Sequence, residues 1–384
     1  MKAQGTVCKL GAIFGKGRSA FGRTTSVLSL GANTKNTVCF LENGLARVSP
    51  VHRDLRDPAD FFSFEKTVKA FLTQKPAIIA YDLHPEYIST KYVHDLSPTT
   101  YHLRPIQHHH AHIAACMAEN NIQNEFVIGV AFDGTGVGTD GHIWGAEFLV
   151  CDYRKFTRAA HLKEIPLVGF DQAIRQPWRL GAAWLSDVYG ERFLRLSIGA
   201  CKRIPSIQWG LLEKMHAAGF AWPRASSMGR LFDAVGFMVF ANANVRFEGE
   251  LAVALEQLAI RARCAQMPYD FAVHKSEAGH IVDPGSMFRQ IVADLQKDVA
   301  RQSIALRFHH TVARMTSDTC LLLRKQTGIR RVVLSGGVFQ NKLLLKLVLD
   351  LLYKHNFTAV THTALPCNDA CVSLGQAVIA GCQR

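Results

Sequence analysis

A strand–turn–strand pattern that occurs twice is the feature that most restricts the fold of this chain. Residues 27–41 read VLSLGANTKNTVCFL, in which two short apolar runs flank a polar turn. Residues 126–150 read FVIGVAFDGTGVGTDGHIWGAEFLV, which is again an apolar strand, a turn rich in Gly, Asp and Thr, and a second apolar strand. Each copy opens a segment with helices and further strands behind it. The repetition indicates an internally duplicated α/β architecture rather than a doubly wound sheet with one nucleotide fingerprint.

Glycine turns in this architecture point to phosphate binding. In a duplicated fold the two turns can face each other across a cleft and present backbone N–H groups to phosphates. A third turn lies in residues 332–344, VVLSGGVFQNKLL, where a buried strand runs through Gly336 and Gly337 into a helix whose N-terminus suits an anion. One glycine turn after a strand is common and predicts little. Three in one chain favour a nucleotide site.

Composition and charge exclude several classes of function. The chain has 384 residues, of which 48% are hydrophobic and 20% charged, as in a globular protein of about two or three domains. It has no apolar run long enough to span a bilayer, so we expect a soluble, cytoplasmic protein without a membrane partner. The net charge of +13 is spread along the chain, which suits an anionic substrate and argues against a nucleic-acid partner. Ten cysteines without a CxxC pair argue against a disulfide framework or a thiolate zinc finger.

Residues 1–25 precede the first expected strand. They contain five Lys and Arg residues and no acidic residue. The stretch GAIFGKGRSAFG lacks the GK[ST] ending that a phosphate-binding loop needs. We expect a basic, flexible lead-in, and a transit peptide of the same composition stays open as an alternative.

A histidine cluster is the strongest candidate for a metal site. Residues 107–120, QHHHAHIAACMAEN, contain four histidines in five positions and no proline or glycine, so they predict a helix. His108 and His112 are then neighbours on one face, as two imidazoles that share an ion must be. His109 and His110 leave that face, and we expect them to lie behind the ligands or toward solvent.

Two carboxylates turn this pair of imidazoles into a metal-site prediction. An HxxxH pair alone more often hydrogen-bonds locally or faces water. Here Asp133 stands at the tip of a strand and Asp369 in the loop PCNDAC, where this kind of fold places ligands. Two imidazoles and two carboxylate oxygens suit zinc or ferrous iron and leave room for a substrate or water. We expect His309 to have a structural role and Cys371 to be a buried thiol rather than a ligand.

Several motifs together resemble one known family. The chain is similar to the C-terminal domain of the hydrogenase-maturation carbamoyltransferase, the HypF type, from about Ser26 to the end. The stretches that carry the resemblance are QHHHAHIAACMAEN, FDGTGVGTDGHIWGAEF, SSMGRLFDAVG, LSGGVFQNKLL and PCNDACVSLGQA, with support from GANTKNTVCFL, YDLHPEYISTKY, AIRQPWRL and RFHHTVA. The resemblance implies an α/β fold of the actin-like ATPase kind, with two duplicated ribonuclease-H-like halves around a central nucleotide and metal cleft. The expected first half is residues 26–122, completed by 368–384, and the second is residues 123–367 with helical insertions.

The resemblance also implies a chemistry and a set of site residues. A carbamoyl group activated as carbamoyl-adenylate is passed to the C-terminal cysteine of a HypE-type maturation partner, toward the cyanide ligands of nickel–iron hydrogenase. One divalent metal, zinc or iron, and an adenine nucleotide (ATP, AMP or carbamoyl-adenylate) are the implied cofactors. No catalytic residue is assigned. The implied metal ligands are His108, His112, Asp133 and Asp369, and the implied nucleotide contacts are Gly134, Thr135, Gly229, Asp233, Glu248, Gly249, Gly336, Gly337 and Asn341.

The chain departs from the family pattern in three ways. The family's acylphosphatase, zinc-finger and adenylate-forming domains lie upstream, whereas only 25 residues precede the first strand here, so we expect activation by a separate domain in trans. The family's Asn-Asp-Gly-Gly is Asn-Asp-Ala-Cys, ending in Cys371, and its Glu-Gly-Gln is Glu-Gly-Glu, ending in Glu250. Cys371 is expected to narrow the nucleotide site and Glu250 to repel a phosphate.

Two other functions stay open at this point. One is a related transferase with another acceptor, for O-carbamoylation or for tRNA threonylcarbamoylation. The other is a subunit that holds a nucleotide without catalysis. The stretches GRLFDAV and DGTGVGTDG favour hydrogenase maturation because both resemble that branch.

Overall fold

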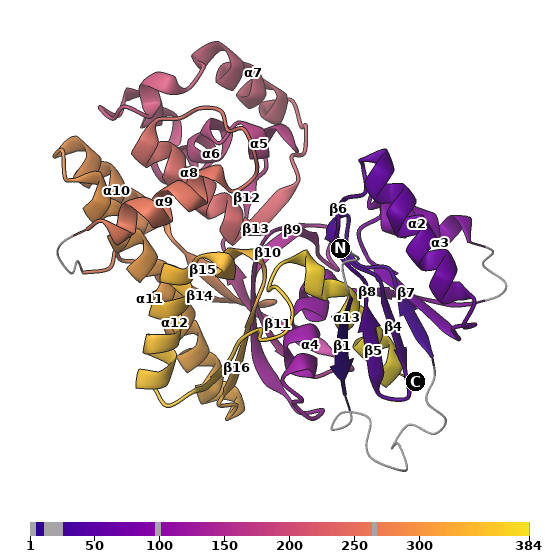
Figure 1. Cartoon of the computed structure of the whole chain (residues 1–384). Coiled ribbons are helices and arrows are strands. Elements are labelled where there is room, and N and C mark those ends of the chain that lie inside the picture. Colours follow the sequence, from indigo (N-terminus) through magenta and orange to yellow (C-terminus); the bar gives the residue numbers. More distant parts are fainter. Residues whose placement is uncertain (1–4, 11–25, 97–100, 263–266, 384) are drawn as a thin grey trace.

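The structure, a computed structural model, describes residues 5–10, 26–96, 101–262 and 267–383. Two mixed sheets stand side by side, with helices between them and on their outer faces (Figure 1). A pair of short strands, β3 (Thr34–Asn36) and β6 (His52–Asp54), forms a small third sheet. The fold is therefore layered α/β, with one large sheet from each part of the sequence.

The first sheet has six strands in the order β1-β5-β4-β2-β7-β8. Its strands are antiparallel from β1 to β2 and parallel from β2 to β8. The predicted pairing of the two apolar runs in residues 27–41 is confirmed, because β2 and β4 are antiparallel neighbours. The strands are β1 (Thr6–Lys9), β2 (Val27–Ser29), β4 (Cys39–Glu42), β5 (Leu45–Val48), β7 (Ile78–Asp82) and β8 (His102–Ile106).

Helices cover both faces of this first sheet (Figure 1). Because successive strand residues point to opposite faces, Leu28 packs in the outer core with α2 and α3, whereas Val27 packs in an inner core with α4 and α13. The second sheet also contributes Val127 and Val333 to the inner core, so α4 and α13 are buried on nearly all sides. The helices are α2 (Pro58–Leu72), α3 (Ile88–Asp95), α4 (His108–Glu119) and α13 (Val372–Cys382).

The second sheet has nine strands, with β14-β15-β11-β10-β9-β16-β17 as its main path and β13 pairing with β10 and β12. The predicted second hairpin is confirmed, since β9 and β10 are antiparallel. The strands β16 and β17 extend the sheet in parallel from β9. The strands are β9 (Val127–Val137), β10 (Ile143–Cys151), β11 (Phe156–Leu162), β12 (Ile165–Pro166), β13 (Arg224–Ser227), β14 (Ala272–Ser276), β15 (Gly279–Asp283), β16 (Arg331–Ser335) and β17 (Thr358–Val360).

Most of the remaining helices pack on the outer face of the second sheet. Alternation again separates the faces: Ala131 enters the inner core and Phe132 the outer core. Gly134, near the end of β9, is thereby brought against Gly229 in the first turn of α8. These helices are α5 (Gln172–Arg175), α6 (Trp178–Tyr189), α7 (Ser206–Ala217), α8 (Met228–Phe240), α9 (Glu250–Ile260), α10 (Gly285–Gln296), α11 (Arg301–Thr327) and α12 (Lys342–Lys354), with 3-10 turns η1 (Gly190–Arg195), η2 (Cys201–Arg203), η3 (Gly337–Gln340) and η4 (Asp369–Cys371).

Two expectations need correction. The prediction of a flexible lead-in is wrong for Thr6–Lys9, which form strand β1 and pair with β5. The edge of β5 offers unpaired backbone groups with which these residues form hydrogen bonds. Residues 11–25 of the lead-in lie outside the described residues. The third glycine turn does not run directly into an α-helix, since the turn η3 comes first and α12 begins at Lys342.

The chain passes from the first sheet to the second between α4 and β9. The last strand of the first sheet ends at Ile106, and the first strand of the second begins at Val127. The C-terminal helix α13 returns to β2, β4 and β7. We propose to keep the predicted boundary at residues 122 and 123, with 368–384 completing the first half.

Candidate functional site

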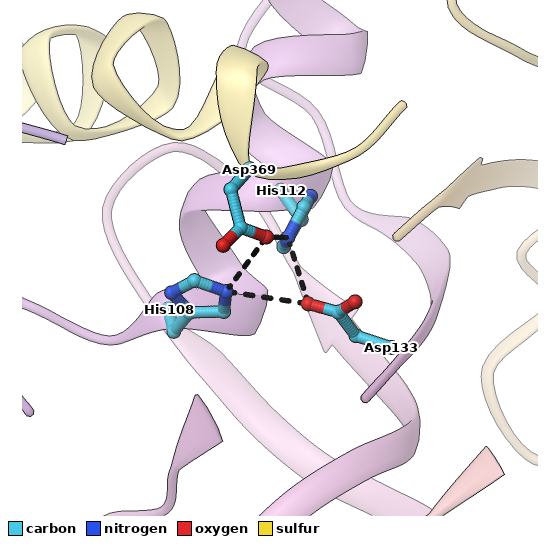
Figure 2. Close-up of side chains that lie close together, drawn as sticks. All are labelled: His108, His112, Asp133 and Asp369. Carbon is cyan, nitrogen blue, oxygen red and sulfur yellow. Dashed lines mark hydrogen bonds and ion pairs between the residues drawn. The ribbon is translucent and has the colours of Figure 1, made fainter. Parts of the chain in front are cut away.

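Four side chains from three separate segments meet between the sheets. His108 and His112 project from the first two turns of α4, Asp133 from β9 and Asp369 from η4 (Figure 2). One ligand atom from each lies within 4.8 Å of the others. The helix begins at His108 because the side chain of Gln107 accepts a hydrogen bond from the backbone N–H of His110, as an N-cap does. The sequence therefore predicted a set that the fold does bring together.

The two imidazoles point the same nitrogen at the two carboxylates. His108 Nε2 lies 3.4 Å from Asp133 Oδ2 and 3.9 Å from Asp369 Oδ1. His112 Nε2 lies 3.3 Å and 3.8 Å from the same oxygens. The histidine side chains are 0% exposed, and those of Asp133 and Asp369 are 11% and 16% exposed. Four donors thus face one small buried space.

Nδ1 of each imidazole ring contacts a residue that is not one of the four candidate ligands. His108 Nδ1 lies 2.7 Å from Asp82 Oδ2, at the end of β7. Against the effect of burial, Asp82 and Asp133 hold the pKa of His108 well above its usual range. In the neutral ring that can bind a metal, Asp82 accepts the Nδ1 proton, which leaves a lone pair on Nε2. His112 Nδ1 contacts Ser335 Oγ at 3.2 Å and Cys371 Sγ at 3.3 Å. Both rings are therefore oriented by neighbours as metal-binding histidines are.

The charges of the cluster are unbalanced. Burial and the neighbouring Asp133 carboxylate raise the pKa of Asp369 to about 7. The pKa of Asp133 lies well below its usual range because, against the effect of burial, His108 and His112 contact its charged form. Burial lowers the pKa of His112. The raised pKa of Asp369 beside the ionised Asp133 reflects two carboxylates crowded into one small space, a situation that a divalent cation relieves.

The donor set fits a zinc or ferrous ion. His112 Nε2 is buried and makes no hydrogen bond with any described residue, although Asp133 is close. A tetrahedral ion with bonds of about 2.1 Å has ligand-to-ligand edges of about 3.4 Å, which matches the distances to Asp133. The longer distances to Asp369 leave space for another ligand. Two nitrogens and two oxygens are donors that both metals accept.

A cavity adjoins the cluster and shares Asp133 with it. Its volume is about 330 Å³. Six of the nine predicted nucleotide contacts line it: Gly134, Gly229, Glu248, Gly249, Gly337 and Asn341. The absence of side chains matters most at Gly229, where a Cβ would lie 2.9 Å from the Cα of Gly134. The ends of β9 and α8 can therefore meet only through glycine.

The other three predicted contacts are not part of the cavity wall. Thr135 lies half-buried in β9. Asp233 is buried behind the wall, where burial raises its pKa to about 6 even though Arg230 Nε is 2.9 Å away. Gly336 has φ +104, donates its N–H to the carbonyl of Cys367, and would clash with the Phe132 carbonyl if it carried a Cβ. Glycine is therefore needed at position 336 for the backbone conformation and not for contact with a ligand.

The sequence reasoning missed several residues of the site. Lys35 and Arg230 line the cavity and supply its positive charge. Arg230 is buried, and its Nη1 has no hydrogen-bond partner among the described residues. The signal was present, since Arg230 lies within the quoted SSMGRLFDAVG. Asp82 was detectable as an acidic residue at the carboxyl end of a buried strand, and Ser335 lies within the quoted LSGGVFQNKLL.

The two suspected departures lie away from the cavity. Glu250 hydrogen-bonds the backbone and guanidinium of Arg246, at 2.7 Å and 3.0 Å, and is not part of the lining. Cys371 packs against His112 instead of the nucleotide cavity. The expected narrowing by Cys371 and repulsion by Glu250 therefore have no geometric support.

Other histidines behave largely as expected. His309 bonds Ala305 O and Asn341 Nδ2, which confirms a structural role beside the cavity. His109 and His110 are turned away from the four ligand atoms, but both are buried, so neither faces solvent.

Two sheets around a cleft, a buried two-histidine, two-aspartate cluster and an adjoining glycine-lined cavity together define a Kae1-like domain. Residues 22–119 match the family described as the HypF Kae1-like domain. Residues 129–376 match the family described as the carbamoyltransferase Kae1-like domain, second subdomain. The chain belongs to the HypF carbamoyltransferase family, and the predicted actin-like ATPase fold is confirmed.

Relatives and solved structures agree with this family. A carbamoyltransferase HypF from Synechocystis sp. is 34% identical over 91% of this chain and 46% of its own length. A carbamoyltransferase HypF homolog from Cupriavidus necator is 34% identical over 93% of this chain and 92% of its own. The crystal structure of a full-length HypF in its phosphate- and nucleotide-bound form has a TM-score of 0.86 and 38% identity over 93% of this chain and 46% of that one. The chain thus spans about half the length of the Synechocystis relative and nearly all of the C. necator homolog.

Among the described helices, none is both apolar enough and long enough to cross a lipid bilayer.

Proposed function

We propose that this chain transfers a carbamoyl group from carbamoyl-adenylate to the C-terminal cysteine of a HypE-type maturation partner. The observation that carries the proposal is the position of Asp133, which belongs to the metal cluster and also lines the cavity. A nucleotide in the cavity would place its phosphate end beside the metal. The nucleotide- and phosphate-bound state of the solved HypF relative supports a nucleotide as the occupant.

The side chains of the cavity suit an anionic nucleotide. Gly134 and Gly229 leave the backbone open for close approach of a phosphate. Lys35 adds positive charge in a partly enclosed space, where charge–charge attraction exceeds its value in water, whereas Arg230 is paired with Asp233 and Glu248. The net charge of +13 also favours capture of an anion that diffuses from another site.

The metal, zinc or ferrous iron, would be held by His108, His112, Asp133 and Asp369. Once bound it supplies a Lewis acid beside the mixed anhydride. The chain's own residues orient these ligands and hold the adenylate with its carbonyl open to the partner. In the transfer, the cysteine sulfur forms a bond to the carbamoyl carbon. The bond from that carbon to the phosphate oxygen breaks, AMP leaves with the electron pair, and the thiol proton goes to solvent.

The test is modification of the partner. The metal-loaded chain, carbamoyl-adenylate supplied by an adenylate-forming domain, and the partner are mixed, and the partner's C-terminal peptide is analysed by mass spectrometry. Carbamoylation is expected, and it should disappear with His112→Ala in the chain or with Cys→Ser in the partner. If the partner stays unmodified while the wild-type chain binds both metal and nucleotide, this chain is a holding subunit instead of a transferase. A mixture without the adenylate-forming domain shows whether the chain needs one.

A further inference from the structure

His112 is connected to a distant carboxylate through two other side chains. Its Nδ1 lies 3.2 Å from Ser335 Oγ, at the end of β16. Ser335 Oγ lies 2.8 Å from Nε2 of His362, in the loop after β17. His362 Nδ1 lies 3.2 Å from Oε1 of Glu119, the last residue of α4, in a close contact that is not aligned as a hydrogen bond. The side chains of His362 and Glu119 are 5% and 0% exposed, so the whole path is shielded from water.

The direction of each contact follows from the carboxylate. A carboxylate has no hydrogen to donate, so its closeness to Nδ1 favours the neutral His362 tautomer with the proton on Nδ1, which leaves Nε2 as an acceptor. Ser335 must then donate its single hydroxyl hydrogen to His362 Nε2. With that hydrogen used, Ser335 Oγ can only accept from His112, which places the His112 proton on Nδ1. His112 Nε2 is left with a lone pair that faces Asp133 and Asp369.

Cys371 competes with Ser335 for the hydrogen bond to His112 Nδ1. Cys371 Sγ lies 3.3 Å from the same Nδ1 of His112. A thiol can donate its hydrogen to that nitrogen, and the His112 proton would then sit on Nε2, where it blocks a metal. Ser335, fixed as an acceptor by His362, favours the opposite arrangement. The tautomer of His112 therefore depends on His362 and Glu119, which set the direction of the Ser335 hydroxyl.

Glu119 also holds the loop that carries His362. Its carboxylate accepts from the backbone N–H of Thr363, and from Ala364 at 3.5 Å and Leu365 at 3.0 Å. The same loop continues to Asp369. These backbone contacts hold the Glu119 carboxylate in place beside His362 Nδ1, which supports the assignment of the His362 proton.

We propose that Glu119, His362 and Ser335 form a relay that fixes the tautomer of His112 and thereby prepares Nε2 for the metal. They are positioning residues, because they act through His112. The inference deepens the proposed function, since it rests on the metal site proposed there. His108 reaches the same state through a single contact with Asp82, whereas His112 needs three residues, each of which can be changed apart from the ligands.

The test compares two substitutions at His362. His362→Gln keeps an oxygen acceptor near the former Nε2, whereas His362→Asn is too short and lacks one. Zinc affinity, measured by competition with a chelating dye, is expected to fall about 10- to 100-fold in His362→Asn and to stay within about threefold of wild type in His362→Gln. His280→Asn is the matched control, because His280 is a buried histidine bonded to Gln326 outside the site.

A second measurement separates the relay from the metal proposal. Nitrogen NMR of the metal-free protein labelled at histidine reports which ring nitrogen of His112 carries the proton. The proposal expects the Nδ1–H form in wild type and in His362→Gln, and loss of that preference in His362→Asn and in Ser335→Ala. If His362→Asn retains both the Nδ1–H form and wild-type zinc affinity, the relay is wrong. If wild type shows the Nδ1–H form but binds no metal, the relay stands and the proposed function fails. The Ser335→Ala variant decides the matter should His362→Asn not fold.

Discussion

The metal cluster and the cavity beside it are specified in opposite ways. The cluster is built from four side chains whose orientation is set by further side chains, and its histidines are fully buried. The cavity wall combines four glycines with apolar and charged side chains, among them the half-exposed Glu248. A metal cluster fails when one donor is removed, whereas a wall that needs glycine at the point where two segments meet fails when volume is added there. The difference predicts which substitutions each region tolerates.

Loss of one ligand should have the largest effect. In His112→Ala we expect metal affinity to fall by more than about 100-fold, since losing a ligand costs more than losing an outer contact. His110→Ala is the control, because this imidazole on the same helix bonds Asp152 O and turns away from the cluster. Metal content after dialysis, measured by elemental analysis, gives the result. Full occupancy in a folded His112→Ala protein would remove His112 from the site.

The pH dependence of the free energy of unfolding should depend on His309, which lies behind the cavity wall. Burial lowers the pKa of His309 to about 4, and its Nε2 accepts from Asn341, which lines the cavity. The unfolded chain takes up this proton near pH 6.5, before the folded protein does. Stability is therefore full above pH 6.5 and is lost as pH falls toward 4, by up to about 3 kcal/mol.

Urea unfolding of the metal-free protein at pH 7 and pH 4.5 is the measurement for His309. His309→Gln keeps an acceptor for Asn341 and does not titrate. Its loss of stability over this interval should be smaller than that of wild type. Parallel losses in the two proteins would show that His309 does not contribute.

A side chain added to the cavity wall should reduce nucleotide affinity by less than the loss of a ligand reduces metal affinity. In Gly229→Ala the new Cβ would lie 2.9 Å from the Cα of Gly134 and 3.3 Å from the carbonyl of Asp133. The end of β9 must move, at a cost of about 1–3 kcal/mol, and we expect AMP affinity to fall about 10-fold by calorimetry. Gly210→Ala on α7, where a Cβ meets nothing within 4 Å, is the control. Unchanged AMP affinity in Gly229→Ala would place the nucleotide elsewhere.

The sequence predicts the metal cluster better than its surroundings, for a physical reason. An i, i+4 histidine pair and carboxylates at a strand tip or in a loop are local patterns, and the duplicated hairpins indicate that they converge. Ser335 and His362 reach the cluster only because β16 lies parallel to β9 and β17 lies parallel to β16. Strand order of this kind depends on packing between segments far apart in the sequence. Strand β1 was missed for a similar reason, since four residues that complete an edge carry little pattern.

Anomalous diffraction from crystals of the metal-loaded chain tests the central claim most directly. Data collected on both sides of the zinc or iron absorption edge locate the ion without assumptions about its ligands. We expect one peak about 2.0–2.2 Å from His108 Nε2, His112 Nε2 and carboxylate oxygens of Asp133 and Asp369. Asp140, His142 and Glu164 form the other group of possible ligands in the described part of the chain, but Arg158 already contacts both of its carboxylates. A peak at that second group, or none at the first, would contradict the account.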